Sequence, residues 1–412
     1  MKNLLYNEGY KNNFRVKKAK NQYIFTSRNK KLIDLSMCSG TLILGHSSKI
    51  YSEAINKQIK EGSAYGLPNE KAEYFSRMLK KIFPKYSKFV MCNSGAEANI
   101  RALRVARAIT KKNSIAMVSG SWHGSLDQLL FDNITINEKI KLSPLSNGLA
   151  TNYSKNVIVL PYNNYELTKK ILKKNKNKIA LVIIEPIQQY IPNELSEIYI
   201  KKILNFCKKN EILICFDEMI TGMRIREFSV QQKLNLSPDI STFGKIIGGG
   251  LPIGVVAINK KIENKLKKIN PRVFFGGTFS GNPLTSHVGA QTIKFILKNK
   301  KKFYLKIEKL SKFFENNLNS FFIKNNIKFK VYNYHSMLRI IFSNEQIYNR
   351  TDRDLSESKL NKKIEKFKKY VIQNGVYHPD RGAYFISYCH SKKDIKYICK
   401  VFIKGMRKYF LD

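Results

Sequence analysis

Two apolar runs separated by a helical pattern constrain the fold of this chain more than any other feature of its sequence. Residues 178–185 and 211–218 are dense in Ile, Leu and Val, which is typical of strands buried on both faces of a sheet. Residues 198–209, between them, have the apolar spacing of a helix. Strands and helices alternate in this way over residues 100–260. We therefore predict an α/β fold with a mostly parallel sheet that is covered by helices on both faces.

The two ends of the chain have a different pattern. Residues 22–36 predict a hairpin, and residues 48–83 predict two helices that are interrupted around residues 61–68. The C-terminal part mixes helices with short strands, and we expect a polar loop over residues 344–357. The predicted segments are residues 1–55 as the N-terminal part of a small domain, residues 56–299 as the large domain, and residues 300–412 as the C-terminal α+β part of the small domain.

The formal net charge is +44, and the pI is about 9.9. A field of this strength could attract nucleic acid or an anionic membrane, but the lysines are spread along the whole chain instead of being gathered on one element. We interpret the excess of positive charge as compositional drift toward Lys, Asn and Ile, and expect neither partner; the same field would favour an anionic substrate.

The sequence shows no Cys-x-x-Cys pair, no signal-peptide core and no apolar stretch of membrane-spanning length. We expect buried free thiols and a cytoplasmic location.

A predicted strand over residues 89–92 leads through Asn93, Ser94 and Gly95 into a predicted helix. The apolar stripe of that helix has spacings of four, three and four residues and consists of Ala98, Ala102, Val105 and Ile109. Unpaired N–H groups and the helix dipole at such an N-terminus favour a bound anion, so this turn is a candidate phosphate seat. A plain helix cap without a ligand is the alternative.

Other strand ends carry aromatic or acidic residues. Trp122, the only tryptophan, follows a predicted strand over residues 115–118, and Glu185 and Asp217 close the two apolar runs. Open α/β sheets bind ligands at the carboxyl ends of their strands, and buried acids there are costly to desolvate. We expect Asp217 to act in a site and not merely to cap a turn. A functional and a structural role stay open for Trp122 and for Glu185.

Lys245 follows a short apolar run and precedes three glycines at residues 248–250. Glycines permit tight turns and a close approach of the backbone to a ligand, so Lys245 is the candidate covalent amine.

Residues 130–156 are polar and show little periodicity. We expect them to form a long loop, which in a compact domain often serves as a lid or a binding segment.

Together these features describe a site for pyridoxal 5'-phosphate (PLP). The phosphate needs N–H donors, the ring needs a flat partner, the ring nitrogen needs a carboxylate and the aldehyde needs an amine. The six histidines form no close pair that would suggest a metal site, and no Gly-x-Ser-x-Gly elbow or Walker loop is present.

Six motifs carry a resemblance to a known family. They are Cys92-Asn-Ser-Gly-Ala-Glu-Ala98, Ser121-Trp-His-Gly124, Ile184-Glu-Pro186, Cys215-Phe-Asp-Glu-Met-Ile-Thr-Gly-Met-Arg224, Thr242-Phe-Gly-Lys-Ile-Ile-Gly-Gly-Gly-Leu-Pro252 and Gly276-Gly-Thr-Phe-Ser-Gly-Asn-Pro283. With these motifs the sequence resembles the class III aminotransferases of PLP fold type I, in particular the glutamate-1-semialdehyde 2,1-aminomutase branch. The motifs follow one another in the family's order and spacing, and weaker similarity covers nearly the whole chain.

The resemblance implies a large domain with a seven-stranded type of sheet, a small α+β domain built from both termini, and a role for each matching residue. Lys245 would form the Schiff base, and Asp217 would pair with the ring nitrogen. Trp122 and Met219 would cover the two faces of the ring, and Thr278 would reach the phosphate bound by a neighbouring subunit, which implies a homodimer with shared active sites. The other cofactor-binding residues would be Ser94, Gly95, Ala96, His123 and Glu185.

The implied function is transfer of an amino group, through Lys245, between an amino donor and a keto or aldehyde acceptor. The alternatives are the intramolecular transfer of the aminomutase and a PLP-fold subunit that binds without catalysis. Three positions depart from the aminomutase pattern: a shorter segment at residues 7–15, Ser39 in place of a tryptophan, and Arg381 near an expected glutamate. Ser39 and Arg381 are therefore the candidate substrate residues, while the donor and the acceptor stay open.

Overall fold

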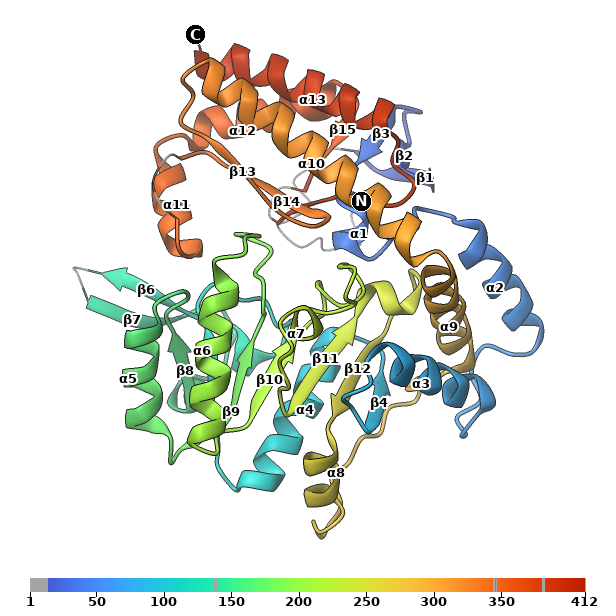
Figure 1. Ribbon diagram of the computed structural model, residues 1–412, viewed down its shortest axis with the longest axis vertical. Coiled ribbons are helices and arrows are strands. Elements are labelled where there is room, and N and C mark those ends of the chain that lie inside the picture. The colour runs from blue at the N-terminus through green and yellow to red at the C-terminus, as the bar shows by residue number, and fades with distance from the viewer. Residues whose placement is uncertain (1–13, 137–138, 344, 346, 380–381, 412) are drawn as a thin grey trace. The chain divides into compact units, whose positions relative to one another are not determined.

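The computed structural model describes residues 14–136, 139–343, 345, 347–379 and 382–411 (Figure 1). The chain forms two compact units, each built from separate stretches of sequence. The first contains the described residues of 1–49, 302–346 and 354–412, and the second contains residues 50–301 and the described residues of 347–353. Residues 7–13 and Arg381, which the sequence associates with the substrate, lie outside the described residues.

A seven-stranded sheet organises the second unit. Only β12 runs antiparallel to its neighbours; the other strands run in one direction, which confirms the predicted mostly parallel sheet. In spatial order the strands are β4 (Lys88–Cys92), β12 (Gly254–Ile258), β11 (Ile240–Gly244), β10 (Ile214–Asp217), β9 (Ile179–Ile184), β5 (Ser114–Val118) and β8 (Val157–Leu160).

Helices cover both faces of this sheet, as the alternation in the sequence predicts. Successive side chains of a strand point to opposite faces, so Leu181 and Ile183 of β9 pack in one core cluster, and Val182 and Ile184 pack in another. The first cluster includes the buried stripe of α4 (Gly95–Thr110). The second includes residues of α5 (Tyr165–Asn175) and α6 (Ser196–Lys209).

The remaining elements of the second unit connect these layers. Helices α2 and α3 are separated at residues 61–69, which confirms the predicted interruption. Their bounds and those of the other described elements are α2 (Lys49–Lys60), α3 (Glu70–Ile82), α7 (Val230–Lys233), α8 (Lys260–Leu266), α9 (Pro283–Lys298), η2 (Asp127–Leu129), η3 (Thr151–Asn156) and η4 (Lys245–Gly248).

The prediction of a long loop over residues 130–156 is wrong. Strands β6 (Phe131–Ile136) and β7 (Lys139–Pro144) pair as an antiparallel hairpin, and η3 follows them. The hairpin is anchored by Asp132, whose buried carboxylate accepts hydrogen bonds from Ser119 Oγ at 2.6 Å and from the Gly120 N–H at 3.0 Å. Because these donors lie on another segment, the local periodicity of the sequence does not reveal the hairpin.

The first unit contains two small sheets and three long helices. One sheet has the order β1-β2-β3-β15, and its β2–β3 pair confirms the predicted hairpin; the other has the order β13-β14-β16. Its elements are β1 (Val16–Lys20), β2 (Tyr23–Thr26), β3 (Lys31–Asp34), α1 (Met37–Gly40), α10 (Lys300–Lys324), β13 (Lys330–Tyr334), β14 (Met337–Ile341), α12 (Asn361–Gln373), β15 (Val376–Tyr377), β16 (Tyr384–Phe385), α13 (Lys392–Met406) and η5 (Arg407–Leu411).

The predicted polar loop over residues 344–357 is also wrong in its second half, where helix α11 (Arg350–Ser358) forms. Asn349 starts this helix by accepting a hydrogen bond from the Asp352 N–H at 3.0 Å, a capping contact that compensates for the low apolar content.

All six cysteines are free thiols, as expected, but Cys38 is exposed and Cys389 is half-buried. Within the described residues, no helix is long and apolar enough to cross a membrane.

Candidate active site

The N-terminus of α4 forms a seat made almost entirely of backbone. Ser94 has an extended conformation, and its Oγ accepts a hydrogen bond from the Glu97 N–H at 3.1 Å. The N–H groups of Gly95 and Ala96 stand in the first helical turn, where a helix offers no acceptor of its own. A Cβ atom on Gly254, the first residue of β12, would lie 2.0 Å from the Ser94 carbonyl oxygen. This position therefore leaves room only for glycine. This arrangement suits an anion such as a phosphate.

The turn after β5 presents Trp122 beside this seat. Its backbone N–H donates to Glu185 Oε2 at 2.9 Å, and 44% of the residue's surface is exposed. Two residues further on, Gly124 has a φ of 87°, and a Cβ atom there would lie 2.8 Å from the Cβ of Ala96. The turn that carries Trp122 is therefore packed against the first turn of α4, and the tryptophan itself remains exposed.

Asp217, at the end of β10, is the most elaborately held carboxylate of the site. Its Oδ2 accepts from Asn99 Nδ2 at 2.9 Å and lies 2.8 Å from His123 Nδ1, while its Oδ1 accepts from the Met219 N–H at 3.1 Å. The side chains of Asp217 and His123 are almost fully buried. These three contacts fix the position of the buried carboxylate.

Met219 closes the site on the side of the glycine residues. Its side chain is 9% exposed, and its Sδ would lie 3.0 Å from a Cβ on Gly95 and 2.6 Å from one on Gly244. The thioether thus occupies the space that side chains at these two positions would need. A flat ligand seated on α4 would meet a small apolar surface here.

Lys245 lies directly after β11, the strand that pairs in parallel with β10. Its φ is 49°, a left-handed conformation that is uncommon for residues other than glycine and that tends to be retained where function requires it. The side chain is half-buried. Burial of the Glu185 carboxyl group raises its pKa to about 7. His123 and the positive charge of Lys245 lower this pKa, but their effect is smaller than that of burial.

The structure thus brings most of the predicted residues to the carboxyl edge of one sheet. Parallel strands β4, β5, β9, β10 and β11 all end there. The residues at or just after these ends are Ser94, Gly95, Ala96, Trp122, His123, Glu185, Asp217, Met219 and Lys245.

These residues fit PLP in three respects. The backbone seat at α4 supplies unpaired N–H groups for a phosphate. The Nε2 atom of His123 is buried and has no hydrogen-bond partner among the described residues, which is costly unless a ligand or water completes the site. An amine, a carboxylate and an exposed tryptophan follow strands of the same sheet at the same edge. Within the described residues, no group of His, Cys, Asp and Glu side chains could hold a metal ion.

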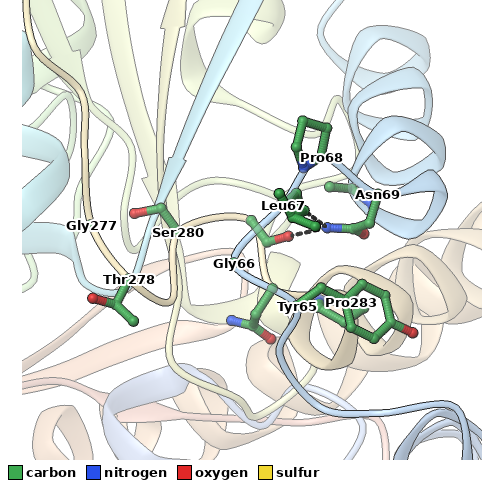
Figure 2. Close-up of a pocket in the computed structure, with 12 residues that line it drawn as sticks. Tyr65, Gly66, Leu67, Pro68, Asn69, Gly277, Thr278, Ser280 and Pro283 are labelled. Carbon is green, nitrogen blue, oxygen red and sulfur yellow. Dashed lines mark hydrogen bonds between the residues drawn. The ribbon is translucent and has the colours of Figure 1, made fainter.

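Thr278 lies in a separate, exposed position. It lines a pocket of about 550 Å³ together with the loop Tyr65–Pro68, as Figure 2 shows. Asn69 connects the two sides of this pocket, because its Nδ2 donates to the Gly281 carbonyl oxygen at 3.0 Å. Several large apolar side chains nearby are open to solvent: Leu67 is 72%, Phe274 73% and Phe279 59% exposed.

Of the two candidate substrate residues, only Ser39 is described. It belongs to the first unit, is exposed, and follows Met37 and Cys38 in a run of three left-handed residues. Its N–H donates to the Ser36 Oγ at 3.3 Å. These facts do not test its proposed contact with a substrate, which stays a prediction.

Sequence reasoning missed Asn99, which is fully buried on α4 and connects Asp217 to β11. A polar residue next to the apolar stripe of a helix that starts at a ligand seat was the available signal. It also missed Arg101, one turn after Glu97 on the same helix, whose side chain is only 5% exposed. Nothing in the spacing of the sequence distinguishes Arg101 from the solvent-facing arginines that follow it.

Known proteins similar to this chain agree with the geometry. The family model described as aminotransferase class-III matches residues 5–403. The glutamate-1-semialdehyde 2,1-aminomutase of Methanocaldococcus jannaschii is 32% identical over 401 residues, which cover 96% of this chain and 91% of that protein. A protein of the same name from Wigglesworthia glossinidia brevipalpis is 35% identical over 385 residues, which cover 92% of this chain and 87% of that protein.

Solved structures of low sequence identity share the fold. An omega-transaminase from Sphaerobacter thermophilus matches with a TM-score of 0.90 at 21% identity, covering 97% of this chain and 92% of that chain. A glutamate-1-semialdehyde aminomutase from Pseudomonas aeruginosa matches with a TM-score of 0.86 at 17% identity, covering 96% and 88% of the two chains. This likeness confirms the fold type that the sequence predicts.

Proposed function

The chain belongs to the class III aminotransferases, and from this we propose that it transfers an amino group between an amino donor and a keto or aldehyde acceptor. The enzymes of this family depend on PLP, which supplies an aldehyde that condenses with amines and a ring that withdraws electrons from the attached carbon. The backbone N–H groups of Gly95 and Ala96 would hold its phosphate, with Trp122 and Met219 on either side of the ring. Thus each part of the cofactor has a partner in this chain.

Asp217 would keep the ring nitrogen protonated. The contacts with Asn99, the Met219 N–H and His123 fix the position of this carboxylate, so that it can accept a hydrogen bond from a cationic partner. Because the group is buried, this interaction is little weakened by solvent. Asp217 would act as a fixed negative charge and would not itself transfer a proton.

Lys245 would be the covalent amine and the proton carrier. Its amine would be the group that holds the aldehyde of the cofactor covalently, and it would serve as base and acid for the proton that moves between the α-carbon of the donor and the cofactor. Lys245 has a left-handed backbone conformation and lies directly after β11, which is the neighbour of the strand that ends at Asp217. This juxtaposition of an amine and a held carboxylate on adjacent parallel strands is the observation that carries the proposal.

Replacement of Lys245 tests this role. Lys245→Ala should lose the visible absorbance of the lysine-bound cofactor and the release of keto product from every amino donor tried. Lys245→Arg, which keeps the charge but not the nucleophile, serves as the matched control and should lose both as well. Retention of the absorbance and of turnover by Lys245→Ala would contradict the proposal. A wild-type chain that binds PLP but releases keto product from no amino donor would instead favour the non-catalytic binding subunit.

Intramolecular transfer is the second candidate, because the curated relatives quoted above are glutamate-1-semialdehyde 2,1-aminomutases. A mutase must retain the intermediate between its two half-reactions, and the hairpin β6–β7, tied to the Trp122 turn through Asp132, is the candidate retaining segment. Conversion of glutamate-1-semialdehyde without added keto acid would support the mutase. A strict requirement for a keto acid would support the transaminase.

We also propose that the enzyme is a homodimer with shared sites, in which Thr278 of one subunit reaches the phosphate held by the other. Thr278 shares a pocket with the exposed Leu67, and the exposed Phe274 and Phe279 belong to the same segment of the chain as Thr278. Exposed apolar groups of this kind favour a protein contact. Phe279→Asp should therefore convert dimers to monomers in size-exclusion chromatography with light scattering. Ile323→Asp, which changes an exposed apolar residue of the other compact unit, should not. A wild-type monomer would overturn this part of the proposal.

The free state of all six thiols is consistent with a cytoplasmic location, which we propose on that basis. Lysines mixed with Asn are spread over the whole chain and are not gathered on one element, which argues against a nucleic-acid partner.

A further inference from the structure

Arg101, in the second turn of α4, holds the segment that carries Thr278. Its Nη2 donates to the Gly276 carbonyl oxygen at 2.9 Å and to Ser280 Oγ at 3.0 Å. Its Nη1 donates to the Met91 carbonyl oxygen on β4 at 2.6 Å. A single guanidinium therefore joins the central sheet, α4 and both sides of Thr278.

This contact is buried and closely packed. The Arg101 side chain is 5% exposed, and Glu97 Oε2 lies 3.5 Å from its Nη2 atom. A Cβ atom on Gly277 would lie 2.9 Å from Arg101 Nη2 and 2.5 Å from Ser280 Oγ. The absence of a side chain at Gly277 is thus what allows the guanidinium to reach between the ends of the segment. A buried arginine with several carbonyl acceptors is costly to disrupt, because its donors would lose their partners.

A second arginine of the same helix acts on the same segment. Arg104 Nη1 donates to the Phe274 carbonyl oxygen at 2.6 Å. Arg107, one turn later, donates instead to the Asn113 carbonyl oxygen, through its Nε and Nη2 atoms. The part of α4 that lies nearest its phosphate seat is therefore also the part that fixes residues 274–280.

We propose that Arg101 is a positioning residue that presents Thr278 to the cofactor of the partner subunit, so that α4 serves its own phosphate through Ser94–Ala96 and the partner's phosphate through Arg101. This inference rests on the proposed dimer with shared sites. It adds that the effect of Arg101 on cofactor affinity is exerted in trans, on the subunit that does not contain the altered residue.

Arg101→Met tests the local part of the inference. In the apoenzyme, hydrogen exchange of residues 274–281 should become faster than in the wild type, because the Gly276 carbonyl and Ser280 lose their donor. The dissociation constant of added PLP should rise about tenfold, as expected for the loss of hydrogen bonds from a charged group. Arg101→Lys should recover part of the affinity. Arg107→Met, the matched control on the same helix, should leave both measurements unchanged.

Gly277→Ala provides an independent variant in case Arg101→Met fails to fold. The added methyl group would separate Arg101 from Ser280 without removing the charge. It should therefore reproduce the faster exchange of residues 274–281 and the weaker binding of PLP. Wild-type exchange and affinity in both variants would overturn the inference.

Hybrid dimers test the action in trans. Only a subunit with Lys245 gives the visible absorbance of the lysine-bound cofactor. A subunit carrying both Arg101→Met and Lys245→Ala, paired with a wild-type subunit, should leave that one visible site weakened about tenfold. An Arg101→Met subunit paired with a Lys245→Ala subunit should show wild-type affinity, because its Thr278 comes from the unaltered chain. The reverse pattern would overturn action in trans and indicate that Arg101 acts on its own phosphate seat.

Thr278→Val separates the two levels of the proposal. If this variant binds PLP like the wild type, the shared site fails, and the role of Arg101 fails with it. If Thr278→Val weakens PLP binding while Arg101→Met and Gly277→Ala do not, the shared site stands and only the role of Arg101 is refuted.

Discussion

Asn99 Nδ2 lies 2.9 Å from Asp217 Oδ2 and equally far from the carbonyl oxygen of His123. The other end of the amide accepts a hydrogen bond from Thr242 Oγ1, also at 2.9 Å. One buried side chain of α4 therefore fixes β10, β11 and the turn after β5 relative to one another. This connection matters because it orients the carboxylate that we assign to the ring nitrogen.

Asn99→Ala should lower kcat about tenfold or more, since the buried Asp217 would lose a donor and would be less firmly oriented. Its effect on KM should be smaller, because Asn99 is not expected to touch the substrate. Steady-state kinetics with the best amino donor measures both. Thr242→Val is the matched control: it removes the bond to Asn99 Oδ1 but leaves the donation to Asp217, and should cost less. Equal kcat values for Asn99→Ala and the wild type would refute the role.

The sheet could be predicted from the sequence because its strands are buried on both faces. Residues 179–184 are all apolar and all buried, so the composition of this stretch admits little else. Hairpin β6–β7 escaped prediction for the opposite reason. Its Asp132 looks like a loop residue, and only the distant donors of Ser119 and Gly120 make it a buried anchor.

The site residues also divide into those that local sequence reveals and those that depend on distant partners. Residues at strand ends, such as Asp217 and Lys245, could be proposed because a parallel sheet gathers its carboxyl ends at one edge. Asn99 and Arg101 lie within a helix and act through contacts with segments far away in the chain. Local spacing does not encode such partners. The substrate residues are less constrained still, since Arg381 lies outside the described part of the chain.

Glu185 should make stability depend on pH. Burial raises its pKa to about 7 from an ordinary 4.5, so the folded chain keeps a proton that the unfolded chain releases. The contribution to stability is therefore fully present below about pH 4.5 and is lost as the pH rises through about 7. Glu185→Gln, which stays neutral and keeps an acceptor for the Trp122 N–H, should match the wild-type melting temperature near about pH 5 and exceed it by a few degrees near about pH 8.

Thermal unfolding of the two apoenzymes at both pH values checks this expectation. Glu218 is also buried, and its pKa is also raised to about 7, but it is present in both chains and cancels in the comparison. A difference in melting temperature that does not change with pH would show that the raised pKa of Glu185 is not expressed in stability.

Asp132→Ala should detach the hairpin β6–β7. Both carboxylate oxygens accept hydrogen bonds from the turn that leads to Trp122, so their loss should speed hydrogen exchange of β6 and lower turnover. Asn133→Ala is the matched control, because it removes a bond from the same strand to the Val159 carbonyl oxygen but leaves that turn intact. If both variants exchange alike and retain full activity, the hairpin is not linked to the site through Asp132.

Trp122 gives a direct optical test of the cofactor position, because it is the only tryptophan in the chain. Trp122 is 44% exposed, in the turn that packs against the α4 seat, so PLP added to the apoenzyme should quench the tryptophan fluorescence as it stacks. Lys245→Ala should show the same quenching without visible absorbance, since binding there needs no covalent bond. Trp122→Phe should still bind PLP, several-fold more weakly, as seen in the visible absorbance. Appearance of that absorbance in the wild type without quenching would place the ring away from Trp122.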